Sequence, residues 1–560
     1  MRAQLRCVAA SLAVLISGWA LPASGQVVAA APPETEPAAK LELDAAPASS
    51  EPDPLAPPDT AGPAPVAPGA PQPTAEAKPA AEADPIVLAV RQQLATLPAR
   101  PSAAEREDWA ALAAYYANGD GQPVWTSKTG LATRGQAAIA EIGKAGDWGL
   151  KAADFELPSA VDPQAGPDAL ATTEIKLARA ALKYARHARG GRLEPSSVSR
   201  IFDQKPVLYD PKSLLEAMAA SEAVDTYLKA LHPQHPQFER LRQALLAARS
   251  ATASRDTVQR ILVNMERWRW MPEKLGELYV WDSVPEQITR VVDKGKVVLA
   301  EKIVVGKGSS PTPIFSADMQ FIIFHPEWGV PDGIKSNELG PKLKKAGDGG
   351  WFSSGYSASA LLKNYDLRVS YNGRIVDPDS VNWSSANVRN YSFVQPAGAK
   401  NVLGIVKFRF PNKHDVYMHD TPERHLFNSG TRAFSHGCMR VQNPVHLAEV
   451  LLAHDKGFSK EKVAGYVQHG GEIKLTTPIP VHIAYFTAVV DDDGKLHNHA
   501  DIYGLDSRVA SALEGGAVHL ASAVAAEGEP AAPRKPRGPA RKSRQATAPQ
   551  QQPFNPFGNN

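Results

Sequence analysis

The runs Lys302-Ile303-Val304-Val305 and Met319-Gln320-Phe321-Ile322-Ile323-Phe324 decide the fold class of this chain. Both are short, rich in β-branched or aromatic side chains, and separated by the strand-ending residues Gly306 and Pro313. Branched and aromatic side chains pack well on a pleated surface, whereas glycine and proline end strands. The sequence therefore predicts a β domain in this part of the chain.

Similar runs lie on both sides of this pair. They are residues 279–281, 287–292 and 297–299 upstream, and residues 402–410, 415–418 and 480–485 downstream. One helix is expected at 444–454. The β domain is therefore expected to span residues 263–487.

Residues 335–392 interrupt this rhythm of strands. The segment is rich in Gly, Ser, Asn and Tyr. A structureless loop of this length is uncommon inside a compact domain, and folded insertions of this kind often cover an active site. We therefore expect a small lid over the site.

Upstream of the β domain, the hydrophobic period is that of a helix. Ile175, Ala178 and Leu182 recur at spacings of three and four residues, which places them on one helical face. The helical pattern stops at a proline at the end of residues 264–272. The sequence predicts a helical domain over 85–262, and thus an α+β multidomain chain.

Both ends of the 560-residue chain lack the composition of a folded domain. Residues 1–25 have the pattern of a signal peptide, and their apolar run is shorter than the ~20 residues of a membrane span. Residues 26–84 are rich in Pro and Ala and are expected to be a disordered linker, as is the basic tail at 514–560. Residues 488–513 form a C-terminal extension. We expect a periplasmic protein with no transmembrane segment after cleavage.

Cys438 is the only cysteine of the exported protein, because Cys7 lies in the signal peptide. A single thiol in an oxidising compartment has no intramolecular disulfide partner, so it is either an inert core residue or a nucleophile. It lies in the run Ser435-His436-Gly437-Cys438-Met439-Arg440, downstream of His419. These neighbours favour a nucleophile. The formal net charge of +2 gives no indication of a nucleic-acid partner.

The residues around Cys438 supply the groups that thiol catalysis requires. His419 is the candidate base, and Asp420 or its backbone carbonyl would hold the imidazole in the tautomer that accepts the thiol proton. Gly437 has no side chain, so its amide and that of Cys438 could form an oxyanion hole. Arg440 is placed to pair with a substrate carboxylate, since a guanidinium matches that group in a bidentate manner.

These residues resemble the catalytic domain of L,D-transpeptidases, the YkuD-type enzymes of bacterial cell walls. The family signature places a histidine upstream of a Ser/Thr-His-Gly-Cys segment, and His419 and Ser435–Cys438 supply both halves. The similarity spans roughly residues 277–487. The helical domain resembles the scaffold region of the larger periplasmic members, although the peptidoglycan-binding module that those members usually carry is not found between Leu241 and Ile261.

The resemblance implies a β-sandwich-like catalytic domain of mixed sheets, with Cys438 as nucleophile and His419 as general base. It implies no cofactor and no metal. The other implied site residues are Asp420 as the orienting neighbour of His419, His436 and Gly437 in the oxyanion region, and Arg440, Tyr417 and Ser435 on the substrate side.

The implied reaction is peptidoglycan L,D-transpeptidation. The Cys438 thiolate attacks a tetrapeptide stem and releases D-alanine, and an amine then resolves the thioester. The product is a 3→3 cross-link or a protein attached to the wall. The implied partners are therefore peptidoglycan tetrapeptide stems and, as another acceptor, an envelope protein.

Two alternatives stay open. A Cys/His peptidase or amidase of peptidoglycan would use the same residues, with water in place of the acceptor amine. A zinc-binding or wall-anchoring protein would instead use imidazole and thiol ligands, although CxxC and HExxH spacings are absent. The candidate ligands are His414, His419, His425, His436 and Cys438.

Overall fold

The computed structural model describes residues 84–117, 122–159, 166–347 and 357–515. The expected signal peptide, linker and basic tail lie outside the described residues, apart from Asp84 at one edge and residues 514 and 515 at the other. Among the described helices, none has both the length and the apolar character of a membrane span.

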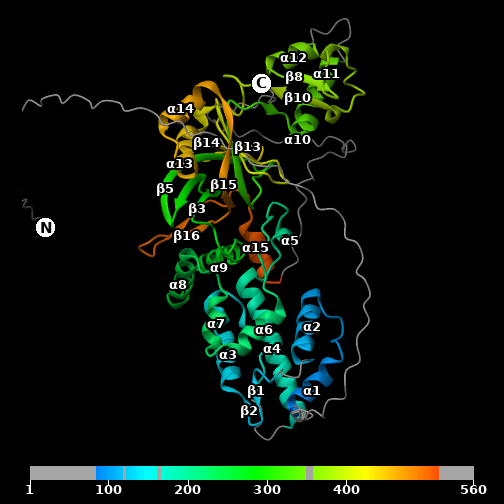
Figure 1. Cartoon of the computed structure of the whole chain (residues 1–560), viewed down its shortest axis with the longest axis vertical. Helices are drawn as coiled ribbons and strands as arrows, with labels where there is room; N and C mark the ends of the chain where they lie inside the picture. Colours follow the sequence, from blue (N-terminus) through cyan, green and yellow to red (C-terminus); the bar gives the residue numbers. More distant parts are fainter. Residues whose placement is uncertain (1–83, 118–121, 160–165, 348–356, 516–560) are drawn as a thin grey trace, which may run out of the picture. The chain divides into compact units, whose positions relative to one another are not determined.

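The region before the β domain is helical, which confirms the prediction for this part of the chain (Figure 1). Several helices, α4 and α8 among them, have proline in their first turn, where the missing N–H would have no partner within the helix. The helices are α1 (Pro85–Leu94), α2 (Ala103–Ala117), α3 (Thr133–Gly143), α4 (Pro167–Gly190), α5 (Pro195–Val198), α6 (Pro211–Ala220), α7 (Val224–Ala230), α8 (Pro236–Ser250) and α9 (Arg255–Arg269). A two-residue ladder joins β1 (Thr126–Ser127) to β2 (Gly130–Leu131).

Helix α4 is the central element of this region. The predicted apolar face is correct, since Ile175, Ala178 and Leu182 are all buried. They belong to a cluster that also holds apolar side chains of α1, α2, α3, α6 and α7. A separate cluster joins Phe238 of α8 and Trp268 of α9 to residues of the β domain.

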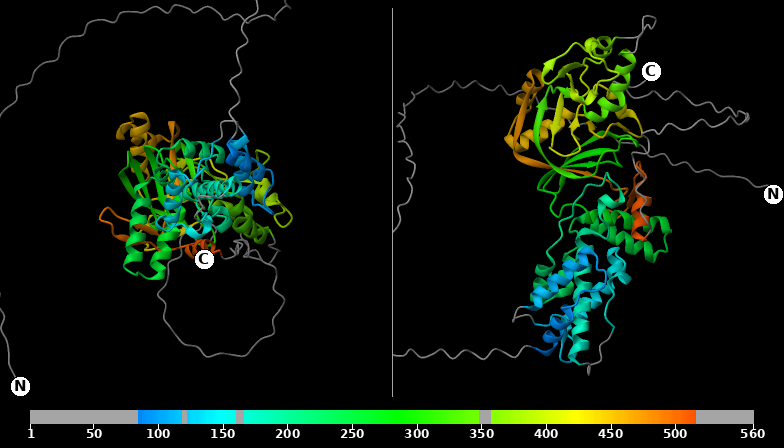
Figure 2. Two further views of the ribbon diagram at one scale, coloured as in Figure 1. Left: turned by 90° about the horizontal axis from the view of Figure 1, so that it is seen from below. Right: turned by 90° about the vertical axis from the view of Figure 1, so that its right-hand side faces the viewer.

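The β domain is a barrel rather than a sandwich, which corrects the expectation of a β-sandwich-like fold. Within the described residues, its strands follow the order β5-β14-β12-β11-β6-β15-β3-β4, and β4 pairs back with β5. The strands are β3 (Leu278–Ser283), β4 (Ile288–Asp293), β5 (Lys296–Gly306), β6 (Ser316–Phe324), β11 (Val406–Arg409), β12 (Met418–His419), β14 (Met439–Val441) and β15 (Gly471–Ala484). Figure 2 shows these strands from two further sides.

Strand β5 closes the barrel because it is long enough to pair with several other strands. Its 11 residues pair with β4 over Lys296–Lys302, and with β14 at Ile303 and Val304. Val305 and Gly306 at its end pair with β13 (Ala433–Ser435). The sheet is mixed, as expected, since β12 with β14 and β3 with β15 run parallel.

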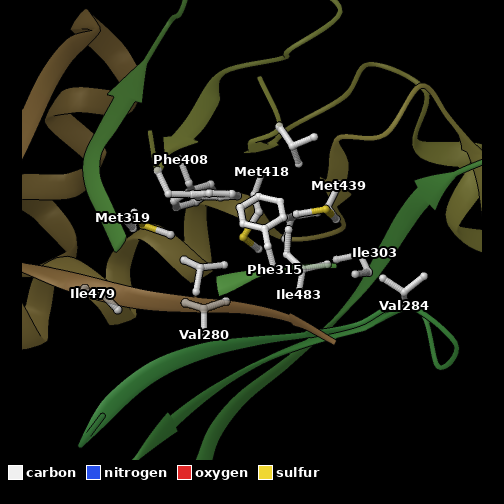
Figure 3. Packing of buried hydrophobic residues seen from close by; sticks show 14 of the residues in the cluster. Val280, Val284, Ile303, Phe315, Met319, Phe408, Met418, Met439, Ile479 and Ile483 are labelled. Carbon is white, nitrogen blue, oxygen red and sulfur yellow. The ribbon is translucent and has the colours of Figure 1, made fainter. Parts of the chain in front are cut away.

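The barrel interior is filled by apolar side chains from all around the sheet. Figure 3 shows ten of them labelled, Met418 and Met439 included. Helices α13 (Pro444–Lys456) and α14 (Lys460–His469) add Leu447 and Val463 to this cluster. The predicted helix at 444–454 is therefore confirmed.

The insertion is a folded unit with its own buried cluster, which includes Leu339, Trp383 and Phe393. Its sheet has the order β7-β10-β8-β9, so the unit begins before residue 335 and ends after residue 392. Its elements are β7 (Trp328–Gly329), α10 (Asp332–Ile334), a π-helical turn (Lys335–Leu339), α11 (Gly340–Gly347), α12 (Ala358–Asn364), β8 (Arg368–Tyr371), β9 (Arg374–Ile375) and β10 (Tyr391–Gln395). Its role as a lid over the site stays a prediction.

The C-terminal extension also has regular structure. It contains β16 (Ala488–Val490), β17 (Leu496–Asn498) and α15 (Asp506–Leu513). Asp506 of α15 accepts a hydrogen bond from Arg267 of α9 at 2.7 Å, a guanidinium that is almost wholly buried. The extension is therefore packed against α9.

Candidate active site

The candidate catalytic side chains lie on the outer face of the barrel. Strands β12 and β14 are parallel neighbours, with Met418 opposite Met439 and His419 opposite Arg440. Both methionines point into the barrel core (Figure 3). Because successive side chains of a strand point to opposite faces, the residues on either side of each methionine face outward. These are Tyr417, His419, Cys438 and Arg440.

A cavity of about 580 Å³ lies over this face. Barrel residues and residues of the insertion both line it, so the insertion borders the site. Of the predicted site residues, His419, Tyr417, Ser435, His436, Cys438 and Arg440 line the cavity. The insertion contributes Trp328, Asp332 and Glu338, among others.

His419 is held in one tautomer by a backbone carbonyl. Its buried ring has Nδ1 at hydrogen-bond distance from the carbonyl oxygen of Asp420, so Nδ1–H donates and Nε2 is left as the accepting nitrogen. The Asp420 carboxylate is used elsewhere: it accepts from the Ile405 amide at 2.9 Å and pairs with Arg424 at 2.6 Å. Of the two orienting groups considered from sequence, the structure shows the carbonyl.

Gly404 explains why the Asp420 carboxylate fits where it does. Its φ is +59°, a conformation that favours glycine, and a Cβ there would lie 2.2 Å from Oδ2 of Asp420. Any side chain at 404 would displace Asp420, and with it the carbonyl that orients His419.

Cys438 and His419 are both held in their neutral forms. Burial raises the pKa of the Cys438 thiol to about 11, although the Tyr417 backbone and the Lys407 and Arg440 charges act against it. Burial, the Arg440 charge and, more weakly, that of Lys407 lower the pKa of His419 to about 3, against the effect of the Asp420 carbonyl. The resting pair is therefore a thiol and a neutral imidazole rather than a preformed ion pair.

The turn that carries Cys438 is closed by Ser435. The hydroxyl of Ser435 accepts from the Gly437 amide at 3.1 Å and donates to the Cys438 carbonyl at 2.6 Å. Gly437 has a φ of +122°, which a residue with a side chain rarely adopts. The Gly437 amide, expected in an oxyanion hole, is thus already engaged, and Ser435, expected on the substrate side, shapes the turn.

Arg440 already has an anionic partner. Its guanidinium forms a largely buried ion pair with Glu423, and Nη1 lies 3.5 Å from the Thr421 hydroxyl. The guanidinium is therefore paired within the protein, and its pairing with a substrate carboxylate stays a prediction. Arg440 acts on the site through its charge, which disfavours the protonated form of His419.

His436 points toward the insertion rather than toward Cys438. Its Nε2 lies 2.6 Å from a carboxylate oxygen of Glu338 and 3.1 Å from Nζ of Lys307. Glu338 belongs to the π-helical turn of the insertion. The side chain of His436 therefore connects the nucleophile turn to the insertion, and the oxyanion region is left to the backbone.

Tyr417 and Lys407 complete the outer face. The Tyr417 ring meets the His419 ring edge to face, with centroids 5.7 Å apart, and Nζ of Lys407 lies 4.0 Å from the centre of the Tyr417 ring. Lys407 is opposite His419 on β11, between the inward-facing Val406 and Phe408. Sequence reasoning missed Lys407 as a site residue. The signal was the apolar-polar-apolar alternation around it.

The zinc alternative finds no support in the described part of the chain. No group of three or more His, Cys, Asp or Glu side chains there is arranged to hold a metal ion. His414 is instead paired with Asp203 at 2.9 Å. His414, His419, His436 and Cys438 line the same cavity, but they do not form a metal-holding group.

A thiol and an imidazole beside one cavity are the side chains that cysteine-dependent acyl transfer uses. Comparison with known proteins agrees: residues 277–479 match the L,D-transpeptidase catalytic domain, and residues 110–245 match the Scaffold domain. The catalytic region belongs to the L,D-transpeptidase catalytic domain family, as the sequence motifs indicated.

A curated relative supports the same family. The chain is 26% identical over 414 residues to a Haemophilus influenzae protein named "Putative L,D-transpeptidase". The match covers 71% of this chain and 78% of the relative. It therefore extends beyond the catalytic domain alone.

Proposed function

We propose that this chain is a periplasmic L,D-transpeptidase that transfers the acyl group of a peptidoglycan tetrapeptide stem to an amine. The observation that carries the proposal is the placement of His419 on β12 and of Cys438 directly before the parallel neighbour β14, beside one cavity. This placement occurs in a domain of the L,D-transpeptidase catalytic family. The acceptor is a second stem, giving a 3→3 cross-link, or an envelope protein.

In the first half-reaction, His419 acts as a general base. Its Nε2 takes the thiol proton as the Cys438 sulfur bonds to the substrate carbonyl carbon, and negative charge develops on the carbonyl oxygen. The Cys438 amide stabilises this oxyanion. The C–N bond to D-alanine then breaks, and the imidazolium returns its proton to the leaving amine. The charge of Arg440 favours this return.

In the second half-reaction, an amine replaces D-alanine. It attacks the thioester while Nε2 of His419 takes its proton, the C–S bond breaks, and the sulfur leaves with the proton that the imidazolium held. Enzyme and proton count return to their starting state, and no cofactor is consumed.

The decisive experiment is a covalent adduct measured by intact mass. A carbapenem is an acylating donor analogue for this family, so the wild-type chain should gain one adduct and Cys438→Ala should gain none. Cys438→Ala should keep the wild-type melting temperature, which separates lost chemistry from lost fold. Adduct formation on Cys438→Ala, or retained cross-linking by it, would rule out this nucleophile.

Transfer and hydrolysis are distinguished by products. The full chain is incubated with a tetrapeptide stem and an amine acceptor, and the products are resolved by mass spectrometry. Release of D-alanine with a new amide bond supports the transpeptidase. Cleavage without a new bond, at any amine concentration, would instead support the peptidase or amidase that uses the same residues.

A further inference from the structure

The peptide group before Cys438 is held from behind by a buried threonine. Thr312 is completely buried, and its hydroxyl donates to the Gly437 carbonyl at 2.8 Å. The same hydroxyl accepts from the Gly306 amide at 2.8 Å. Both hydrogen-bonding directions of this hydroxyl are therefore used, and its orientation is determined.

This contact determines where the Cys438 amide points. In a trans peptide the carbonyl and the next N–H point in opposite directions. Because Thr312 binds the Gly437 carbonyl on one side, the Cys438 N–H points away from Thr312. The Gly437 amide, by contrast, is bound by Ser435. Thr312 thus sets the direction of the Cys438 N–H, whereas Ser435 binds the other amide of this turn.

Thr312 is in turn held by the C-terminal extension. The Tyr503 hydroxyl accepts from the Thr312 amide at 3.1 Å and donates to the Gly306 carbonyl at 2.7 Å. The Tyr503 amide donates to the Tyr485 hydroxyl at 2.9 Å, and that hydroxyl donates to Asp501 at 2.6 Å. A continuous chain of hydrogen bonds therefore runs from the extension to the nucleophile turn.

The packing around Gly306 leaves little freedom in this arrangement. A Cβ at position 306 would lie 2.3 Å from the Ser310 carbonyl oxygen and 2.6 Å from the Thr312 amide nitrogen. The chain between Gly306 and Thr312 therefore folds tightly back on itself. Tyr503 lies outside residues 277–479, which match the catalytic family, so its support of the turn is added by the extension.

We infer that Thr312 is a positioning residue that aims the Cys438 amide at the oxyanion, and that Tyr503 of the C-terminal extension holds Thr312 in place. The inference rests on the proposed acyl transfer at Cys438. Thr312 touches the peptide group and not the sulfur. Its loss should therefore slow acylation without changing the ionisation of the thiol.

The test compares two reactions of Cys438 in the full chain. Iodoacetamide alkylates the thiolate and needs no oxyanion hole, whereas p-nitrophenyl acetate acylates the sulfur through a tetrahedral oxyanion. Thr312→Val removes the hydroxyl at nearly constant volume, Thr312→Ser keeps it, and Tyr503→Phe removes the supporting hydroxyl. Tyr209→Phe, on an exposed tyrosine of the helical region, is the matched control.

Thr312→Val should lower the acylation rate by about 100-fold and Tyr503→Phe by about tenfold, while Thr312→Ser and Tyr209→Phe stay near wild type. The rate and pH profile of alkylation should be the same in every variant. Unchanged acylation in Thr312→Val would overturn the inference, and so would a parallel fall of alkylation. If Thr312→Val does not fold, the acylation and alkylation rates of Tyr503→Phe test the inference in its place.

The proposed function and this inference are contradicted by different experimental outcomes. Wild-type chain that is acylated by the ester but transfers no tetrapeptide stem would remove the transpeptidase proposal. The dependence of acylation on Thr312 would still stand in that case. Conversely, normal stem transfer by Thr312→Val would remove the positioning role and leave the transpeptidase proposal intact.

Discussion

Two buried carboxyl groups, Glu174 of the helical region and Asp282 of the barrel, have opposite hydrogen-bonding surroundings. Glu174 of α4 accepts hydrogen bonds from the Tyr116 hydroxyl, the Val124 and Trp125 amides, and the amide and hydroxyl of Thr126. Asp282 of β3 is equally buried, yet neither of its oxygens has a hydrogen-bond partner among the described residues. The same type of group is saturated in one region and unsatisfied in the other.

This difference in hydrogen bonding gives Glu174 a structural role and leaves Asp282 as a group that titrates. Burial raises the pKa of Glu174, but its donors act against that rise and stabilise the carboxylate. In the barrel, burial raises the pKa of Asp282 to about 7. Cys438 and His419 are likewise shifted toward their neutral forms. Burial thus shifts the pKa values of the two candidate catalytic groups on the outer face. Inside the barrel, it makes the charged form of Asp282 unfavourable for stability.

The largest expected effect follows from removing the candidate base, His419. His419→Ala should lower the rate of Cys438 acylation by about 10³-fold, because a positioned general base contributes on this scale. Stopped-flow measurement with a carbapenem gives the rate, and His469→Ala, on an exposed histidine of α14, is the control. A variant acylated as fast as the wild type would remove His419 from its role.

The Glu174 carboxylate should affect the stability of the fold and not the acylation of Cys438. Glu174→Gln should lower the free energy of unfolding by about 3 kcal/mol, since an amide cannot accept from all of these buried donors. Urea denaturation measures the change, with the exposed Glu216→Gln as control. The rate of acylation per folded molecule should be unchanged, and a fall in that rate would contradict the division between the two regions.

Asp282 should make stability depend on pH. Its pKa is raised in the folded state, so the stabilising proton is bound at low pH and is lost as pH rises toward about 7. The free energy of unfolding should fall by about 2 kcal/mol from pH 5 to pH 7 through this group alone. Asp282→Asn should flatten that dependence. Equal pH dependence in variant and wild type would show that the carboxyl is stabilised in some other way.

Lys407 should give the smallest effect. Its charge opposes the burial that raises the pKa of Cys438, so Lys407→Met should slow alkylation by iodoacetamide at pH 8 by about threefold. Lys407→Arg should restore most of the rate. Lys462→Met serves as the control because it removes a similar cation from α14. Nζ of Lys462 lies 3.7 Å from the centre of the Phe458 ring. A wild-type rate in Lys407→Met would show that the ammonium is too well solvated to act on the sulfur.

Hydrophobic periodicity predicted the type of each region but not the closure of the barrel. Spacings of three and four residues identified α4, and short branched runs identified β5 and β6, because these patterns reflect which face of one element is buried. Closure depends on the pairing of β5 with β4, β13 and β14 at once. No local pattern contains that information.

Several of the predicted site residues line one cavity, but their hydrogen-bond and ion-pair partners were not predicted. Cys438, His419 and Tyr417 were found because the motif is local in sequence, and alternation places them on one face. The partners were not found, because Arg440 meets Glu423 and Ser435 occupies the Gly437 amide only after the chain folds.

The sequence by itself determined a helical region, a strand-rich region, one thiol and its candidate base, since each follows from the spacing and chemistry of nearby residues. The tertiary structure alone decided that the carbonyl and not the carboxylate of Asp420 orients the imidazole, that burial shifts the thiol and the imidazole toward their neutral forms, and that the remote Tyr503 hydrogen-bonds with Thr312. These outcomes depend on burial and on hydrogen bonds between distant segments, and both exist only once strand register has brought those segments together.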